Sequence, residues 1–171
     1  MKSIQQFLQE IDIRKSYRRR AEMYVVDGDS IWVGVKDNDK VLKNSYTIPG
    51  GGVDDGETPI NGAIRETLEE VAIRVKNIKD ITLRPPFRLD FDDPGDSRWK
   101  GTEIYSFTAE FDKVDKRLWG KGGPDGKFKP KKVKIKMLID HFSKKRYPEF
   151  YPGKWREVRN KYVVKILKTL I

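Results

Sequence analysis

The sequence predicts a single domain in which strands and helices are mixed, of the α/β or α+β class. The chain has 171 residues, which is the length of one domain that can bury a core without disulfides. Strand-like segments are interspersed with helical ones along the chain, and neither an internal repeat nor an interdomain linker separates them. We therefore expect residues 1–171 to form one domain.

The first 73 residues are expected to contain two helices and three strands. Apolar residues recur at helical spacing near the N-terminus, and two β-rich runs separated by Asp27-Gly28-Asp29 have the pattern of a hairpin. A third extended run ends at Pro49, and a turn-rich segment over 49–57 precedes the second helix. The expected elements are a helix over 3–15, strands over 21–26, 31–35 and 46–48, and a helix over 58–73.

The remaining residues are expected to form two more strands and a terminal helix. The runs 75–83 and 102–111 are strand-like and are separated by a loop rich in Pro, Asp and Gly. Gly, Pro and Lys dominate residues 118–132, which predicts a loop, whereas 133–143 fits either a strand or a helix. An apolar stripe over 155–170 predicts the terminal helix.

The composition excludes several kinds of site. With no cysteine there is no disulfide, thiol nucleophile or cysteine metal site, and the single histidine, His141, excludes multi-histidine metal centres. No run of about 18 apolar residues is present and the N-terminus lacks an apolar signal region, so we expect a cytoplasmic protein with no membrane partner.

The positive charge is concentrated in the last third of the chain. The whole chain has a formal charge of +10, but residues 1–111 hold 17 basic and 20 acidic side chains, a balance of −3. Residues 112–171 hold 19 basic and 6 acidic ones, a balance of +13. This asymmetry indicates either a solvated basic face or an anionic partner such as RNA.

The helix expected over 58–73 carries the most informative pattern. Thr58 can cap it, and Pro59 suits its first turn because its missing N–H would be unpaired there. On a wheel of 100° per residue, one side is apolar apart from a threonine and the other side carries three carboxylates. The first side holds Ile60, Ala63, Ile64, Thr67 and Val71, and the second holds Glu66, Glu69 and Glu70.

Three carboxylates at positions i, i+3 and i+4 repel one another and weaken a helix, so they are tolerable when a divalent cation lies among them. An acidic helix face is usually only a solvated surface. Here the pattern also includes a glycine turn, with Gly51 six residues before Glu57 and Arg65 eight residues after it. At roughly 6% usage per residue, six such fixed positions match by chance in about one of ten thousand or more chains of this length.

This pattern resembles the signature of the Nudix hydrolase family, Gly-x5-Glu-x7-Arg-Glu-U-x-Glu-Glu-x-Gly-U, where U is a bulky apolar residue. It runs here from Gly51 to Ile73, and the preceding residues 46–51 resemble the lead-in of the family. All charged positions match, but Thr67 stands where an apolar residue is usual and Ala72 replaces a glycine. If that position requires a left-handed backbone, we expect the helix to run on or to end differently.

The resemblance implies an α/β/α sandwich with a mixed sheet, here with extra N- and C-terminal helices. It also implies hydrolysis of a pyrophosphate bond in a nucleoside diphosphate derivative, with Mg²⁺ or Mn²⁺ as cofactor. By this resemblance Glu66 or Glu69 is the base that accepts a proton from water, while Arg65 and Glu57 orient the site. The metal ligands implied are Gly51, Glu66, Glu69 and Glu70.

Other residues remain open from the sequence. A carboxylate outside the signature can be the base in some family members, and the candidates here are Glu103, Glu110 and the loop residues Asp90, Asp92, Asp93 and Asp96. For substrate binding we select Arg98, Trp99 and Lys100, where an aromatic ring lies between two cations. Neither the substrate nor the oligomeric state is specified, although family members often form homodimers.

Two other functions compete with the leading one. The +13 balance of the last third and the basic run over 14–20 favour removal of a cap or pyrophosphate from the 5′ end of RNA. A Nudix-like module that senses a nucleotide without cutting it is the non-enzymatic alternative. Degenerate modules usually lose a metal glutamate, whereas all three are present here.

Overall fold

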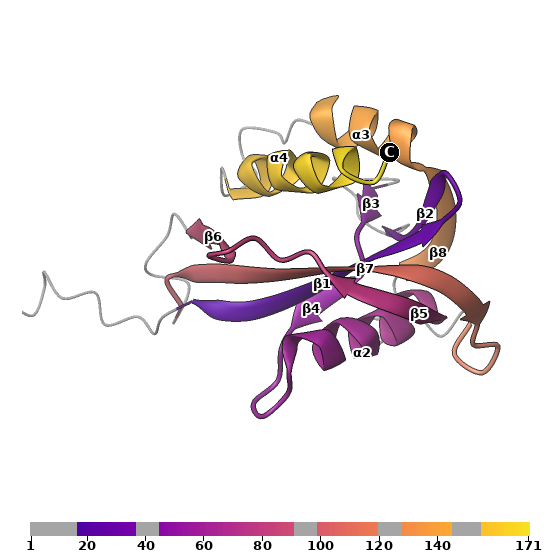
Figure 1. Cartoon of the computed structure of the whole chain (residues 1–171), viewed down its shortest axis with the longest axis horizontal. Coiled ribbons are helices and arrows are strands. Elements are labelled where there is room, and N and C mark those ends of the chain that lie inside the picture. The colour runs from indigo at the N-terminus through magenta and orange to yellow at the C-terminus, as the bar shows by residue number, and fades with distance from the viewer. Residues whose placement is uncertain (1–16, 37–44, 91–98, 120–127, 145–154) are drawn as a thin grey trace, which may run out of the picture.

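The protein is built around an eight-stranded mixed sheet with helices on both faces (Figure 1). A computed structural model describes residues 17–36, 45–90, 99–119, 128–144 and 155–171. Helix α2 covers one face of the sheet, and helices α3 and α4 lie together over the other face (Figure 1). This arrangement confirms the predicted α/β class. The helix expected over 3–15 lies outside the described residues.

Most elements fall where the sequence places them. The strands β1 and β2 form the predicted hairpin, α2 is the predicted signature helix, and α4 is the predicted terminal helix. In chain order the elements are β1 (Arg18–Asp27), β2 (Ser30–Lys36), β3 (Ser45–Thr47), β4 (Gly50–Gly52), α2 (Pro59–Val71), β5 (Ile73–Asp80), β6 (Phe87–Asp90), β7 (Gly101–Val114), β8 (Phe128–Lys134), α3 (Ile135–Lys144) and α4 (Trp155–Lys168).

Three strands lie where the sequence indicates turns or loops. Strand β4 lies in the turn-rich segment, β6 in the loop before β7, and β8 covers residues 128–132, which were expected to be a loop. The ambiguous segment 133–143 resolves into the end of β8 followed by α3. Strand β8 pairs only with β2 among the described strands, so it is an edge strand, where lysines and Pro130 are tolerated.

The centre of the sheet brings the glycine segment against the longest strands. Strands β1 and β7 pair in parallel from Arg18 opposite Thr102 onward, and β4 runs antiparallel to β1 with Gly52 opposite Arg20. The Val53 N–H also donates to the Arg19 carbonyl at 3.0 Å, which extends this pairing toward α2. The glycine segment is therefore held by the sheet.

Successive side chains of β1 point to opposite faces of the sheet, so the core has two layers. Ala21, Met23 and Val25 point toward α2 and belong to the cluster beneath that helix. Tyr24 points to the opposite face and packs with buried residues of α3 and α4, such as Leu138. Among the described residues, no helix is both long and apolar enough to span a membrane.

Candidate metal and active site

Helix α2 begins and ends at defined positions. Thr58 is extended and its side chain accepts a hydrogen bond from the Asn61 N–H at 3.4 Å, so it is the predicted cap, and Pro59 occupies the first turn. At the other end Ala72 adopts the left-handed conformation with φ of 53°, and its N–H donates to the Leu68 carbonyl at 3.0 Å. The helix therefore ends at Ala72, in a conformation that glycine adopts at lower cost.

The apolar side of α2 is buried with one exception. Ala63, Thr67 and Val71 are buried and Ile64 is partly buried against the same cluster. Ile60 was expected on this side but is 37% exposed. The Thr67 hydroxyl donates to the Ala63 carbonyl at 2.7 Å, which satisfies the polar group within the apolar layer.

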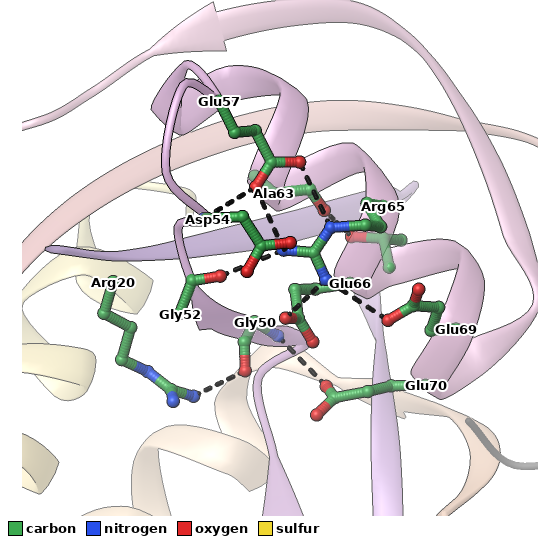
Figure 2. Close-up of polar contacts among 11 residues, drawn as sticks. Arg20, Gly50, Gly52, Asp54, Glu57, Ala63, Arg65, Glu66, Glu69 and Glu70 are labelled. Atoms are coloured by element: carbon green, nitrogen blue, oxygen red, sulfur yellow. Dashed lines mark hydrogen bonds and ion pairs between the residues drawn. The ribbon is translucent and has the colours of Figure 1, made fainter. Parts of the chain in front are cut away.

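Arg65 joins the loop before α2 to the helix itself (Figure 2). Its guanidinium donates to both carboxylate oxygens of Glu57, at 3.1 and 3.0 Å, and to the Gly52 carbonyl at 3.0 Å. A further nitrogen of the same group donates to Glu66 at 2.9 Å and to Glu69 at 3.3 Å. The guanidinium thus holds Glu57, Glu66, Glu69 and β4 in one arrangement.

The glycines of β4 bring the backbone into contact with two of the carboxylates. The Gly50 N–H donates to Oε2 of Glu70 at 3.0 Å, and Figure 2 shows Glu66 and Glu70 beside this strand. A β-carbon placed on Gly51 would lie 2.3 Å from the Glu66 carboxyl group. A residue larger than glycine at position 51 would require the Glu66 carboxylate to move.

Burial alters the protonation of the carboxylates. It raises the pKa of Glu70 to about 7, against the opposing effects of the Gly50 N–H and the Arg20 charge. Hydrogen bonds from Arg65 hold the pKa of Glu57 below its usual value. Hydrogen bonds to Glu57 first, and then to Glu66, raise the pKa of Arg65. Arg65 and Glu57 therefore form an ion pair at neutral pH.

The donor set fits a hard divalent cation. Three carboxylates and a backbone carbonyl at Gly51 are oxygen ligands of the type that Mg²⁺ and Mn²⁺ prefer. Among the described residues, no three histidine, aspartate or glutamate side chains converge closely enough to hold a metal as they stand. One reason is that Glu66 and Glu69 are both turned to Arg65, so binding would require their carboxylates to reorient.

One residue beside this site was missed from the sequence. Glu22 on β1 is completely buried, and its Oε1 accepts from Arg159 of α4 at 2.6 Å and from Arg20 at 3.1 Å. Despite burial, these two cations hold its pKa below the usual value. A charged residue inside the apolar run over 21–26 was the available signal, since such a group is buried only with partners.

The remaining candidate residues are engaged elsewhere or cannot be placed. On β7, Glu103 accepts hydrogen bonds from Arg88 at 2.9 Å and from the Tyr105 hydroxyl at 2.6 Å, and Glu110 accepts from the Asn77 side chain. None of these partners is a residue of α2.

The three residues selected for substrate binding are only partly described. Arg98 and the loop residues Asp92, Asp93 and Asp96 lie outside the described part of the chain. Trp99 and Lys100 are half-buried and lie just before β7, at the end where Thr102 is opposite Arg18. They therefore remain candidates by position alone.

With this geometry in place, comparison with known proteins shows the family. The NUDIX domain model matches residues 16–142, so the chain belongs to the NUDIX domain family. The match covers β1 through most of α3 and includes every signature residue, while α4 lies beyond it.

Two curated relatives have the same name. An RNA pyrophosphohydrolase of Erythrobacter litoralis is 26% identical over 106 residues, which cover 58% of this chain and 64% of the relative. An RNA pyrophosphohydrolase of Bartonella quintana is 35% identical over 82 residues, 44% of this chain and 46% of the relative. The matches thus span between about half and two thirds of the length of these relatives.

Solved structures share the fold at low identity. A MutT structure, from work on the Aliivibrio salmonicida and Vibrio cholerae proteins, superimposes with a TM-score of 0.56 at 21% identity, covering 92% of this chain and all of that one. The Bacillus subtilis pyrophosphohydrolase gives a TM-score of 0.55 at 16% identity, covering 89% of this chain and 79% of that one. At this identity the likeness supports the fold alone.

Proposed function

We propose that this protein hydrolyses a pyrophosphate bond in a nucleotide or nucleotide conjugate, with Mg²⁺ or Mn²⁺ as cofactor. The observation that carries the proposal is the complete set of signature carboxylates on α2, two of which, Glu66 and Glu70, lie against the glycine strand β4, in a chain of the NUDIX domain family. The non-catalytic alternative is disfavoured because no acidic signature residue is lost.

In this proposal the residues of the chain have distinct roles. Glu66, Glu69, Glu70 and the Gly51 carbonyl hold the cation, which when bound neutralises phosphate charge and lowers the pKa of the attacking water. Either Glu66 or Glu69 accepts the proton from that water. Arg65 is a positioning residue, since its contacts orient these carboxylates rather than reach the reacting atoms.

The first test is Glu70→Gln. The substitution keeps the shape and an acceptor for the Gly50 N–H but removes a negative charge from the cation site, so turnover should fall by several orders of magnitude without loss of the fold. The matched control is Glu157→Gln, an exposed glutamate on α4, which should keep normal turnover. Near-normal activity of Glu70→Gln would contradict the assignment.

The assay needs a panel of nucleoside triphosphates, dinucleoside polyphosphates and nucleotide sugars, with and without Mg²⁺ or Mn²⁺. We expect metal-dependent release of phosphate, pyrophosphate or a nucleoside monophosphate from at least one class, abolished by chelator. If neither the compounds of the panel nor RNA with a 5′ triphosphate or cap is cut under any metal condition, the hydrolase proposal fails and the sensing module takes its place.

A second candidate function is supported by separate observations. Both curated relatives are named RNA pyrophosphohydrolases, and the last third of this chain has a balance of +13. RNA with a 5′ triphosphate or a 5′ cap is therefore the first macromolecular substrate to test. Absence of product from both RNAs, alongside activity on free nucleotides, would remove this candidate.

A further inference from the structure

The lysines of the edge strand β8 are divided between the two faces of the sheet. Val133 packs in the core beneath α3 and α4, and Lys131, two residues before it, therefore points to the same face. Lys132 and Lys134 point to the other face, since Lys132 is opposite Trp32, which packs against the core beneath α2. One strand thus places its lysines in two different surroundings.

The lysines on the α2 side are neutralised by aspartates. The Lys132 ammonium group lies 2.8 Å from the carboxylate of Asp27, and Lys134 donates to both carboxylate oxygens of Asp29. Each positive charge on this side of β8 is therefore matched by a negative charge from the hairpin of β1 and β2.

The lysine on the opposite side contacts an aromatic ring instead of a carboxylate. The Lys131 ammonium group donates to the Tyr46 hydroxyl at 3.4 Å and lies 5.4 Å from the centroid of the Tyr46 ring on β3. Within the described part of the chain, neither Lys131 nor the exposed Lys136 of α3 forms an ion pair with a carboxylate. The nearby Asp140 is paired with Lys144 at 2.6 Å, so Lys131 and Lys136 keep their positive charge uncompensated.

A depression lies between β3 and α3, next to these lysines. Its volume is about 460 Å³, and its lining residues are Tyr46, Lys136, Met137, Asp140 and His141. Met137 is 60% exposed, although it is a large apolar side chain. We refer to Tyr46, Lys131, Lys136 and Met137 together as the Tyr46 surface.

An aromatic ring beside uncompensated lysines is typical of surfaces that bind single-stranded nucleic acid. Lysine ammonium groups attract the phosphates, and bases stack on aromatic rings. The depression has a volume within the range of ligand pockets, about 300–1,000 Å³, so it has room for a base. An acidic peptide would pair with the lysines but offers no base to stack on Tyr46.

The Tyr46 surface is close to the proposed metal site along the chain. Tyr46 precedes Gly51 by five residues, and five residues span at most about 18 Å. At about 3.4 Å per stacked nucleotide, a strand of about five nucleotides covers this distance. An RNA whose 5′ end lies at the carboxylates can therefore reach the Tyr46 surface.

We propose that the Tyr46 surface binds single-stranded RNA a few nucleotides downstream of the 5′ end that occupies the carboxylate site. This inference rests on the second candidate function, removal of a cap or pyrophosphate from RNA, for the identity of the substrate. The binding itself involves no bond cleavage, so it can be measured separately from hydrolysis.

The direct test is fluorescence anisotropy with a labelled RNA of about ten nucleotides that has a 5′ hydroxyl group, and therefore no pyrophosphate bond. The double variant Lys131→Gln/Lys136→Gln should bind it at least tenfold more weakly than the wild type. The matched control Lys132→Gln/Lys134→Gln removes the same charge from the aspartate-paired face of β8, and should change the affinity less than threefold. Equal losses in the two double variants would overturn the proposal, because only the net charge would then matter.

The dependence of the affinity on salt is a second readout. On single strands the logarithm of the affinity falls with the logarithm of salt by about 0.7 per phosphate contact, so loss of two contacts should make the slope shallower by about 1.4. The control double variant should keep the wild-type slope. Competition with polyglutamate tests the alternative occupant, since displacement of the RNA at an equal concentration of charge would identify a general anion-binding surface and overturn the assignment to RNA.

The outcomes separate this inference from the proposed function. Weakened RNA binding in Lys131→Gln/Lys136→Gln, without cleavage of 5′-triphosphate or capped RNA by the wild type, removes the RNA-processing function and leaves the surface as an RNA-binding site. Cleavage of such RNA by the wild type, with unchanged RNA affinity in this double variant, overturns the surface and leaves the function intact. Circular dichroism confirms that each variant is folded.

Discussion

The two buried alanines of the signature segment, Ala63 and Ala72, differ in backbone conformation and should respond differently to replacement by glycine. Ala72 is left-handed, which costs an L-residue about 1–2 kcal/mol, whereas Ala63 is inside α2. In Ala72→Gly, relief of this backbone strain stabilises the folded state. It is opposed by the loss of a buried methyl group, worth about 0.8 kcal/mol, and by the greater conformational entropy of glycine in the unfolded chain. The free energy of unfolding should stay within about 0.5 kcal/mol of wild type.

The control for this prediction is Ala63→Gly. It loses a buried methyl and about 1 kcal/mol of helix propensity without relief of strain, so it should destabilise by about 2 kcal/mol. Urea denaturation measures both variants. Equal losses at the two positions would show that the left-handed conformation of Ala72 carries no cost.

A second prediction at the residue scale concerns Asp115, which follows β7. Its carboxylate accepts from the Arg74 guanidinium at 3.0 and 2.7 Å, and bonds with Arg117 first, then Arg74, hold its pKa well below the usual value. Because the pKa of Asp115 is lower in the folded than in the unfolded protein, its charge stabilises the fold at a pH above the unfolded-state pKa of about 3.9. This stabilisation is lost as the pH falls through the folded-state pKa.

Asp115→Asn should therefore lower the melting temperature at pH 7, and the difference from wild type should narrow as the pH falls below about 4. Thermal unfolding followed by circular dichroism between pH 2 and 8 measures this. The matched control is Asp112→Asn, at an exposed position of β7, which should melt close to wild type at each pH. A difference for Asp115→Asn that does not vary with pH would contradict the role of its charge.

At the scale of elements, Arg65 connects α2 to the loop before it and to β4. Lysine keeps the charge but cannot donate simultaneously to Glu57, Gly52 and the helix glutamates. Arg65→Lys should weaken apparent Mn²⁺ affinity or activity about 10–100-fold, as for other residues that orient metal ligands. Titration of activity against Mn²⁺ and paramagnetic resonance of bound Mn²⁺ provide independent readouts.

The comparison variant for this element is Arg84→Lys, which replaces an exposed arginine paired with Asp80 four residues earlier. We expect it to bind Mn²⁺ as the wild type does. Arg65→Lys with unaltered Mn²⁺ affinity and activity would mean that the carboxylates hold their arrangement without the guanidinium.

At the scale of the whole molecule, the charge asymmetry predicts salt-dependent binding of RNA. The site-bearing residues 1–111 have a balance of −3 and the last third has +13, so long-range attraction of phosphates comes from the C-terminal part. If several phosphates are contacted, the logarithm of the affinity should fall linearly with the logarithm of salt, with a slope near −0.7 per contact on single strands. Filter binding between 50 and 200 mM salt measures this, and salt-insensitive binding would exclude the RNA hypothesis.

The signature helix was predictable from the sequence because its determinants are local. A cap at Thr58, a proline in the first turn and apolar residues at helical spacing act within a few residues of one another. The grouping of Glu66, Glu69 and Glu70 on one side follows from the helix period alone. The exposure of Ile60 could not be predicted from the helix period, because it depends on which distant residues pack against the first turn of the helix.

Strands β4 and β8 could not be predicted because glycines and lysines have weak strand preference, and the four-residue β6 is a strand through its pairing with β7. Gly50–Gly52 becomes a strand only because β1 provides its hydrogen-bond partners, and β8 likewise depends on β2. Strand propensity depends on packing against neighbours, so it is not encoded within three glycines or a lysine-rich segment.

The sequence by itself determined the family signature, the α2 helix and the set of acidic residues that would hold a metal, because these depend on residue type and spacing. Only the tertiary structure decided that Glu22 is buried between Arg20 and Arg159, and that Lys131 of β8 lies against Tyr46 of β3. Glu22 and Arg159 are 137 positions apart in the sequence, and they are brought together by packing of the sheet against α4 rather than by any local pattern.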